Sequence, residues 1–172
     1  MFGSPAFRRL EDREEAPCSF ECDAQSGDSQ RLTQIARAAK ARWGYPEAWL
    51  IAWQPLLSVT PEYVKRQLVF VGDRGDETVG FYVLEPRGDY WSLEHFWVDP
   101  RWHGHGVGRR MFSDAIDRIR SVRPGVMVIE ADPYAAGFYA RMGARPTGTV
   151  PAPVEGDFDR TLPVYEIEVR AA

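Results

Sequence analysis

The chain of 172 residues contains no long hydrophobic run. No stretch approaches the roughly twenty apolar residues of a membrane-spanning helix, and Met1 to Pro17 lacks the apolar core of a signal peptide. We therefore expect a cytoplasmic protein that does not act at a membrane. Concentrated basic charge is also missing, because the net charge is −4 and the arginines are dispersed. We expect no nucleic-acid partner, since such proteins usually carry a basic patch.

Residues that bind metal ions are few. Cys18 and Cys22 have no further Cys or paired His to complete a zinc site, so we expect two reduced thiols. The histidines His95, His103 and His105 likewise have no acid or thiol at a recognisable ligand spacing. The sequence therefore predicts no bound metal.

The composition that remains is that of an ordinary soluble protein, with 44% hydrophobic and 27% charged residues. The length suits one well-buried domain and is short for two. Residues 1–16 are rich in charge and poor in apolar side chains, so we expect a flexible tail there. We expect residues 17–172 to form the single domain.

The first half of the chain changes from helical to extended patterning. A short strand is predicted at 18–24. Apolar residues at helical spacing then predict one helix from about Leu32 to Trp43 and another from Pro46 to Leu57. Three strands separated by tight turns follow, at 68–72, 78–85 and 90–98. Their short connections predict an antiparallel meander.

The second half begins with a glycine-rich segment and a long amphipathic helix that ends near Pro124. A nearly all-apolar strand over 126–131 should lie parallel to 90–98 through a right-handed crossover. A short helix over 134–142 and two strands, at 145–150 and 162–170, complete the pattern. We expect an α/β (α+β) fold with a mostly antiparallel central sheet of six to seven strands and about four helices.

The most informative stretch runs from Ser92 to Arg110. An aromatic strand leads into three glycines at alternate positions, Gly104, Gly106 and Gly108, and a helix begins almost at once. Free backbone N–H groups and the positive end of the helix dipole point at one spot there, and glycine lets an anion approach. The stretch predicts a phosphate cradle.

Two common phosphate cradles do not fit. A nucleotide P-loop needs Gly-Lys-Ser/Thr, and here Gly108 is followed by Arg109-Arg110. A dinucleotide fingerprint needs a third glycine at the position of Arg109 and belongs to the first βα unit, whereas this loop follows a meander.

Two motifs flank the helix that follows the glycines. The segment Arg101 to Gly106, Arg-Trp-His-Gly-His-Gly, matches the pattern Arg/Gln-x-x-Gly-x-Gly/Ala. After the next strand, Asp132 to Tyr139 and then Gly143-Ala144 are similar to Asn-x-x-Ala-x-x-Phe-Tyr followed by Gly-Phe. The two motifs resemble those of the GNAT N-acetyltransferase superfamily, in which the first binds acyl-CoA. Asp132 stands where Asn is common, and Ala144 where Phe is usual. The resemblance implies that the parallel pair of strands is splayed.

The resemblance also implies acetyl-CoA as cosubstrate and transfer of its acetyl group to a primary amine by direct attack in a ternary complex. The pyrophosphate would lie on the amides of the glycine loop, and the pantetheine arm along 96–98. Tyr139 would protonate the leaving thiolate, because an ordinary phenol is protonated at neutral pH. The implied cofactor-binding residues are Phe96, Trp97, Val98, Arg101, His103, Gly104, His105, Gly106, Val107, Gly108, Arg109, Asp132, Phe138 and Tyr139.

An amine acceptor is mostly protonated at neutral pH, so a base is useful, either directly or through water. Glu94 is the first candidate, because a carboxylate within an aromatic strand is costly unless it is paired or used. Glu130, at the end of the neighbouring strand, is the second. A structural hydrogen-bonding role is an equally good explanation for either residue. His95 is a further candidate for assisting proton removal.

The acceptor stays open, as a small-molecule or peptide amine. Trp43 and Tyr45 could form a wall of its pocket, although rings at helical spacing usually pack into the core. The segment 151–160 carries Glu155, Asp157 and Asp159, which would favour a cationic acceptor if this loop overhangs the site. A homodimer is left open. The alternative to an enzyme is a non-catalytic acyl-CoA-binding sensor or interaction module.

Overall fold

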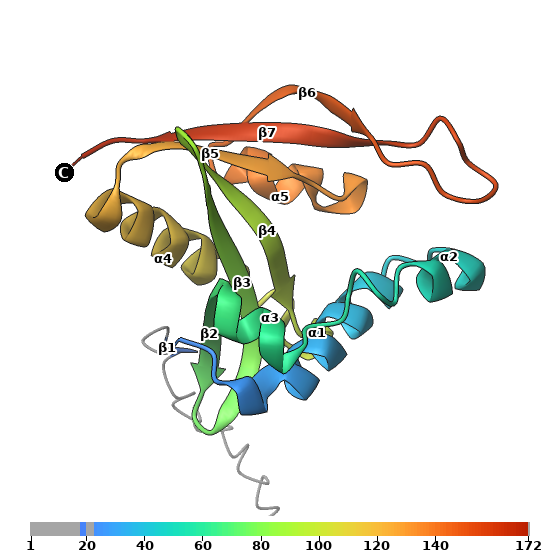
Figure 1. Ribbon diagram of the computed structural model, residues 1–172, viewed down its shortest axis with the longest axis horizontal. Helices are drawn as coiled ribbons and strands as arrows, with labels where there is room; N and C mark the ends of the chain where they lie inside the picture. Colours follow the sequence, from blue (N-terminus) through green and yellow to red (C-terminus); the bar gives the residue numbers. More distant parts are fainter. Residues whose placement is uncertain (1–17, 20–22, 172) are drawn as a thin grey trace, which may run out of the picture.

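A single sheet of seven strands runs through the part of the chain that the computed structural model describes, residues 18–19 and 23–171 (Figure 1). The predicted tail over 1–16 and Cys22 lie outside the described residues. The strands are β1 Cys18–Ser19, β2 Leu68–Arg74, β3 Glu77–Arg87, β4 Tyr90–Val98, β5 Gly125–Glu130, β6 Arg145–Pro151 and β7 Thr161–Val169. Their order is β1-β2-β3-β4-β5-β7-β6. All neighbours are antiparallel except β4 and β5, which confirms the predicted mixed sheet.

Five α-helices lie in the described chain, one more than the pattern predicted. They are α1 Ser29–Ala41, α2 Glu47–Ala52, α3 Pro61–Arg66, α4 Val107–Val122 and α5 Ala136–Arg141, with short 3-10 turns η1 Ser26–Asp28, η2 Pro100–Trp102 and η3 Pro133–Ala135. The unpredicted helix α3 has a recognisable start, because the Thr60 side chain accepts a hydrogen bond from the Tyr63 N–H (3.1 Å) and Pro61 follows directly. Helix α2 ends at Ala52, short of the predicted Leu57, since Pro55 has no N–H and disfavours helical backbone before it.

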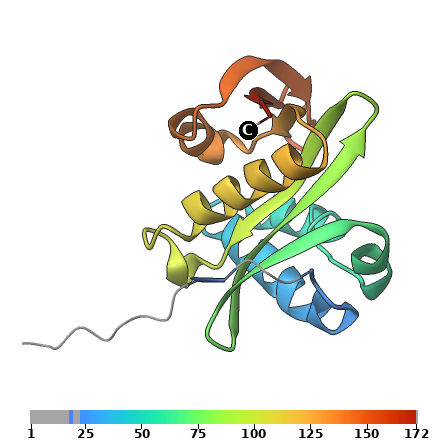
Figure 2. The same cartoon turned by 90° about the vertical axis from the view of Figure 1, so that its left-hand side faces the viewer.

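Helices cover both faces of the meander β2–β4. Helix α4 lies on one face and helices α1 and α3 lie on the other (Figure 2). The α4 face holds the larger apolar cluster, which includes Tyr82, Met111 and Met127, all completely buried. The smaller cluster joins α1 to the opposite face through Leu32, Ile35 and neighbouring apolar residues. Apolar packing thus covers both faces of the sheet beside β4.

Strands β4 and β5 separate soon after they meet (Figure 1). Their pairing runs only from Tyr90 opposite Val126 to Ser92 opposite Val128. Beyond Ser92, β5 continues along β7 instead, so the second half of β4 has an open edge on that side within the described residues. The parallel pair is therefore splayed, as the family resemblance implied.

A bulge at Glu94 decides which side chains of β4 face the splay. Val83 lies opposite His95 and Leu84 lies opposite Leu93, so Glu94 is the extra residue. The bulge reverses the alternation of faces. Phe96 and Val98 therefore pack with the α4 cluster, while Trp97 packs with the α1 cluster.

No helix in residues 18–19 and 23–171 has the length and apolar character needed to cross a lipid bilayer.

Candidate functional site

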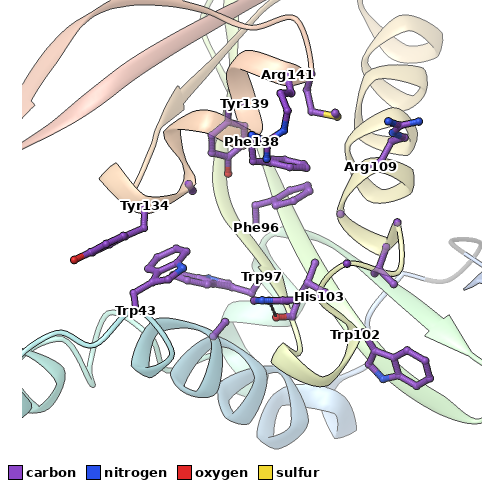
Figure 3. Close-up of a pocket in the computed structure, with 18 residues that line it drawn as sticks. Trp43, Phe96, Trp97, Trp102, His103, Arg109, Tyr134, Phe138, Tyr139 and Arg141 are labelled. Carbon is purple, nitrogen blue, oxygen red and sulfur yellow. Dashed lines mark hydrogen bonds between the residues drawn. The ribbon is translucent and has the colours of Figure 1, made fainter.

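A cavity of about 580 Å³ lies at the splay, bounded by the open half of β4, the glycine loop, the first turn of α4 and helix α5 (Figure 3). Two ring contacts belong to its lining. Phe96 and Phe138 pack against each other with centroids 5.5 Å apart, and Trp43 stacks with Tyr134 (5.9 Å, 24°). Most of the predicted cofactor residues line this cavity: Phe96, Trp97, Val98, His103, Gly104, Gly106, Val107, Gly108, Arg109, Phe138 and Tyr139.

The three loop positions require glycine for two different structural reasons. Gly104 (φ +83°) and Gly106 (φ +77°) have left-handed backbone that side chains rarely adopt, and open space lies where a Cβ would stand. Gly108 has ordinary backbone, but a Cβ there would come within 3.3 Å of the Phe138 ring. The first two glycines keep the loop open, and the third lets α4 approach α5.

Free amide groups gather at the start of α4. The hydrogen bond that closes its first turn runs from Arg110 N to Gly106 O (3.1 Å). The N–H groups of Val107, Gly108 and Arg109 precede that bond and have no carbonyl partner within the helix. These residues line the cavity, so donors and the positive end of the helix dipole meet there. This arrangement suits a phosphate or another anion.

The hydroxyl of Tyr139 points into the same cavity (Figure 3), although the residue is only 5% exposed. Rings surround it, including Phe96, Phe138 and Tyr165. Burial, together with the nearby charge of Asp132, raises the pKa of Tyr139 above its ordinary value. The phenol therefore keeps its proton at neutral pH.

Arg101 lies outside the cavity lining. Its guanidinium donates to Asp99 (2.8 Å) and Glu77 (2.5 Å), and Arg31 donates to the same Asp99 carboxylate (2.7 Å). Burial of Asp99 favours its neutral form, but the hydrogen bonds from Arg101 and Arg31 outweigh this and lower the pKa of Asp99 well below its usual range. These side chains form a network of ion pairs at the end of β4.

His105 and Asp132 also lie outside the lining of the first cavity. The Nδ1 atom of His105 contacts the carbonyl of His103 (3.1 Å). Asp132 belongs to a separate buried group behind η3. Its carboxylate accepts hydrogen bonds from Lys40 Nζ (2.5 Å), the Tyr45 hydroxyl (2.9 Å) and the Tyr134 N–H (3.0 Å). It thereby ties α1 to η3.

Lys40 is buried in a cage of rings. Its Nζ atom lies 4.2 Å from the centroid of Trp53 and 4.8 Å from that of Tyr45. Desolvation lowers the pKa of Lys40, although the bond to Asp132 opposes this, and the charge of Arg160 lowers it further.

Trp97 lines both the first cavity and a second one of about 280 Å³. The indole N–H of Trp97 donates to Nδ1 of His95 (2.9 Å), which fixes the orientation of the ring. Burial lowers the pKa of His95, so its imidazole is neutral and can accept this bond. Glu130, Lys40, Asp132 and Arg160 bring charge to the second cavity, and its other walls are largely apolar.

The two predicted bases have different locations. Glu130 lines the second cavity. Glu94 lines neither cavity; it is the exposed bulge residue, and its carboxylate lies 3.4 Å from the Arg87 guanidinium. The bulge turns this position away from the splay.

Trp43, which the sequence suggested as a wall of the acceptor pocket, lines the first cavity. Sequence reasoning missed several other lining residues: Ala39, Trp102, Tyr134, Ala135, Arg141 and Met142. Tyr134 lies inside the second motif and could have been found there. Arg141 follows Phe138 at helical spacing on α5, and this signal was also available.

The acidic loop between β6 and β7 reaches toward α2. The Trp49 indole N–H donates to the carbonyl of Glu155 (2.8 Å), which joins the two segments. The carboxylates of Glu155, Asp157 and Asp159 belong to neither cavity lining.

The sheet with a splayed parallel pair and an anion cradle at the splay defines a class of proteins that bind a phosphorylated cofactor. The model of the acetyltransferase (GNAT) domain family matches residues 56–152, which is more than half of the chain. The chain therefore belongs to the GNAT acetyltransferase family, and the resemblance predicted from the two motifs is confirmed.

Solved structures share the fold across most of the chain. A GCN5-related N-acetyltransferase from Rhodopseudomonas palustris is 18% identical, with a TM-score of 0.72 and coverage of 90% of this chain and 97% of its own. The PaiA N-acetyltransferase from Thermoplasma acidophilum, solved with coenzyme A, is 14% identical, with a TM-score of 0.68 over 87% and 99% of the two chains. The protein yncA from Salmonella typhimurium, solved with acetyl-CoA, is 18% identical, with a TM-score of 0.63 over 90% and 95%. No curated protein matches the sequence.

Proposed function

We propose that the protein transfers the acetyl group of acetyl-CoA to a primary amine, by direct attack in a ternary complex formed by a single domain over residues 17–172. One observation carries the proposal. The free amides of the glycine loop, the open edge of β4 and the hydroxyl of Tyr139 all meet in one cavity. The structures of related fold that were solved with coenzyme A or acetyl-CoA support the choice of cofactor.

The cofactor would follow the cavity. Its pyrophosphate would accept hydrogen bonds from amides between His103 and Arg109, with the side chains of Arg109 and Arg141 close by. Its pantetheine arm would lie along the edge of β4 at 96–98, where strand pairing has stopped. One carbonyl of that edge is already used, because His103 Nε2 contacts Val98 O (3.0 Å). The thioester would then lie between Tyr139 and Trp97.

The reaction needs a base and an acid. The amine nitrogen attacks the thioester carbonyl carbon, a C–N bond forms and the C–S bond breaks. The nitrogen gives its proton to the base, and the departing sulfur takes a proton from Tyr139, whose raised pKa keeps it protonated until then. Proton exchange with water restores both groups.

Glu130 is the base that we propose, acting directly or through a water molecule. It is exposed but lines the second cavity, and the Trp97 ring lines both cavities, so an amine lying there would approach the thioester beside this ring. Glu94 lines neither cavity, and its carboxylate pairs with Arg87.

The test is release of free CoA thiol from acetyl-CoA with a panel of amines. We expect Tyr139→Phe to lower kcat by about 100-fold or more, the lower range of acid catalysis, with the Kd for acetyl-CoA nearly unchanged. Tyr90→Phe is the matched control, because Tyr90 is exposed at the far end of β4.

Two outcomes would overturn the proposal. If acetyl-CoA binds but no amine accelerates thiol release, the chain is instead a non-catalytic acyl-CoA-binding module. If acetyl-CoA does not bind at all, neither function stands.

A further inference from the structure

We propose that the second cavity binds an acceptor that carries a carboxylate next to its amine, namely an amino acid with an apolar side chain. The inference rests on the proposed function and names its acceptor class. It follows from two charged groups of opposite sign, Arg160 and Glu130, that line one small cavity and have no ion-pair partner among the residues that the structure describes.

Arg160 immediately precedes β7 and supplies the positive group. Its guanidinium lies over the rings of Trp53 (5.0 Å to the centroid) and Tyr45 (5.9 Å). One N–H donates to the carbonyl of Ala152 (3.1 Å), and the Tyr45 hydroxyl interacts with another. A guanidinium has five N–H donors, so others are left over. No carboxylate of residues 18–19 and 23–171 lies within ion-pair distance of it.

Lys40 strengthens the positive end of the cavity. It lies close enough to Arg160 for the two charges to repel, and Asp132 offsets only one of them. This carboxylate already accepts bonds from Lys40, Tyr45 and the Tyr134 backbone. An excess positive charge therefore remains where Arg160 faces the cavity, and a planar guanidinium suits a carboxylate.

Glu130 supplies the negative group. It ends β5 opposite Val164 of β7 and lines the same cavity. Within the described part of the chain it has neither a hydrogen-bond partner nor an ion-pair partner for its carboxylate. An ammonium group placed here would lie beside the proposed base. The two groups thus complement both ends of a zwitterion.

The remaining walls select an apolar side chain. They include the rings of Trp53 and Trp97 and the side chains of Leu57 and Leu162. A space of about 280 Å³ suits a single amino acid. The acidic side chains of the β6–β7 loop do not line it, so a polycationic acceptor has no matching surface in this cavity.

The experiment compares acceptors that differ only at the carboxylate. The kcat/KM of acetylation is measured for leucine, methionine and phenylalanine and for their carboxamides, with each N-acetyl product identified by mass spectrometry. We expect the wild type to prefer the free amino acids by about tenfold or more, since charge-assisted hydrogen bonds are the stronger ones. Arg160→Gln should remove most of this preference while it changes kcat/KM for the carboxamides by less than about threefold.

The amines of an amino acid and of its carboxamide have different pKa values. This difference affects the wild type and Arg160→Gln equally, so it cancels when the ratio of the two kcat/KM values is compared between the two enzymes. Arg145→Gln, an exposed arginine on β6, is the matched control and should keep the wild-type ratio. An equal loss for both substrates in Arg160→Gln would overturn the inference, because the preference would then not depend on this guanidinium. Acetyl transfer itself would still stand. Failure of every amine, by contrast, would overturn the proposed function.

Discussion

The two cavities that share Trp97 in their linings are built in different ways. The first is formed mainly by the end of β4, the glycine loop, the start of α4 and helix α5, with Ala39 and Trp43 added from the end of α1, and much of its chemistry comes from backbone amides and an open strand edge. The second gathers side chains from α1, β5 and the end of the β6–β7 loop. A cradle of backbone groups suits a cofactor that stays the same, whereas side chains from separate segments can be replaced when the acceptor differs. The predictions below test this contrast.

The largest effect is expected in the backbone cradle. Gly106→Asp places a carboxylate where the pyrophosphate should lie and forces a side chain onto left-handed backbone. We expect the affinity for acetyl-CoA to fall by more than about 100-fold, which is about 2.7 kcal/mol, in isothermal titration. Gly75→Asp is the matched control, because Gly75 also has positive φ (+60°) and open space but lies in the β2–β3 turn. Unchanged affinity in Gly106→Asp would refute the cradle.

The next prediction concerns Asp132, which lines the second cavity. Lys40 and Asp132 are only 10% and 8% exposed, so Asp132→Asn leaves a buried cation with no full counter-charge. We expect the free energy of unfolding to fall by about 3–5 kcal/mol, as when one partner of a buried pair is removed. Urea denaturation measures it.

The double variant Lys40→Met with Asp132→Asn is the control for that experiment. It removes both charges, and we expect most of the lost stability to return. A loss below about 1 kcal/mol in Asp132→Asn would mean that the rings of Trp53 and Tyr45 hold the Lys40 cation without its partner.

The sequence predicted the first cavity much better than the second. Alternating glycines and a following amphipathic helix are local signals, and they were enough to single out Gly104, Gly106 and Val107, which line the first cavity. Strand patterning was similarly local, and the sheet of seven strands followed from it. Arg160 was not singled out, because nothing in its own neighbourhood shows that it will face Trp53, more than a hundred positions earlier.

Glu94 illustrates a different limit. In an unbroken strand it would share a face with Phe96, and a carboxylate there would point toward the splay. The bulge between Leu93 and His95 reverses the alternation and leaves Glu94 exposed beside Arg87. A bulge of this kind depends on the partner strand, so the pattern of β4 alone does not reveal it.

The smallest effect is predicted for Arg101, although it belongs to the matched motif. Its guanidinium is held by Asp99 and Glu77 and lies outside the first cavity, whereas Arg109 lines that cavity. We expect Arg101→Gln to change the Kd for acetyl-CoA by less than about twofold, and Arg109→Gln to raise it by about three- to tenfold, the range of a partly exposed charge–phosphate contact. The Kd of the wild type and of both variants is titrated at low and high salt, because a variant that has lost a charge–phosphate contact should show a smaller salt dependence than the wild type. If Arg101→Gln were the more damaging change and the one that reduced the salt dependence, this arginine would leave Asp99 and Glu77 to bind the cofactor, and the first cavity would depend on side chains as much as the second does.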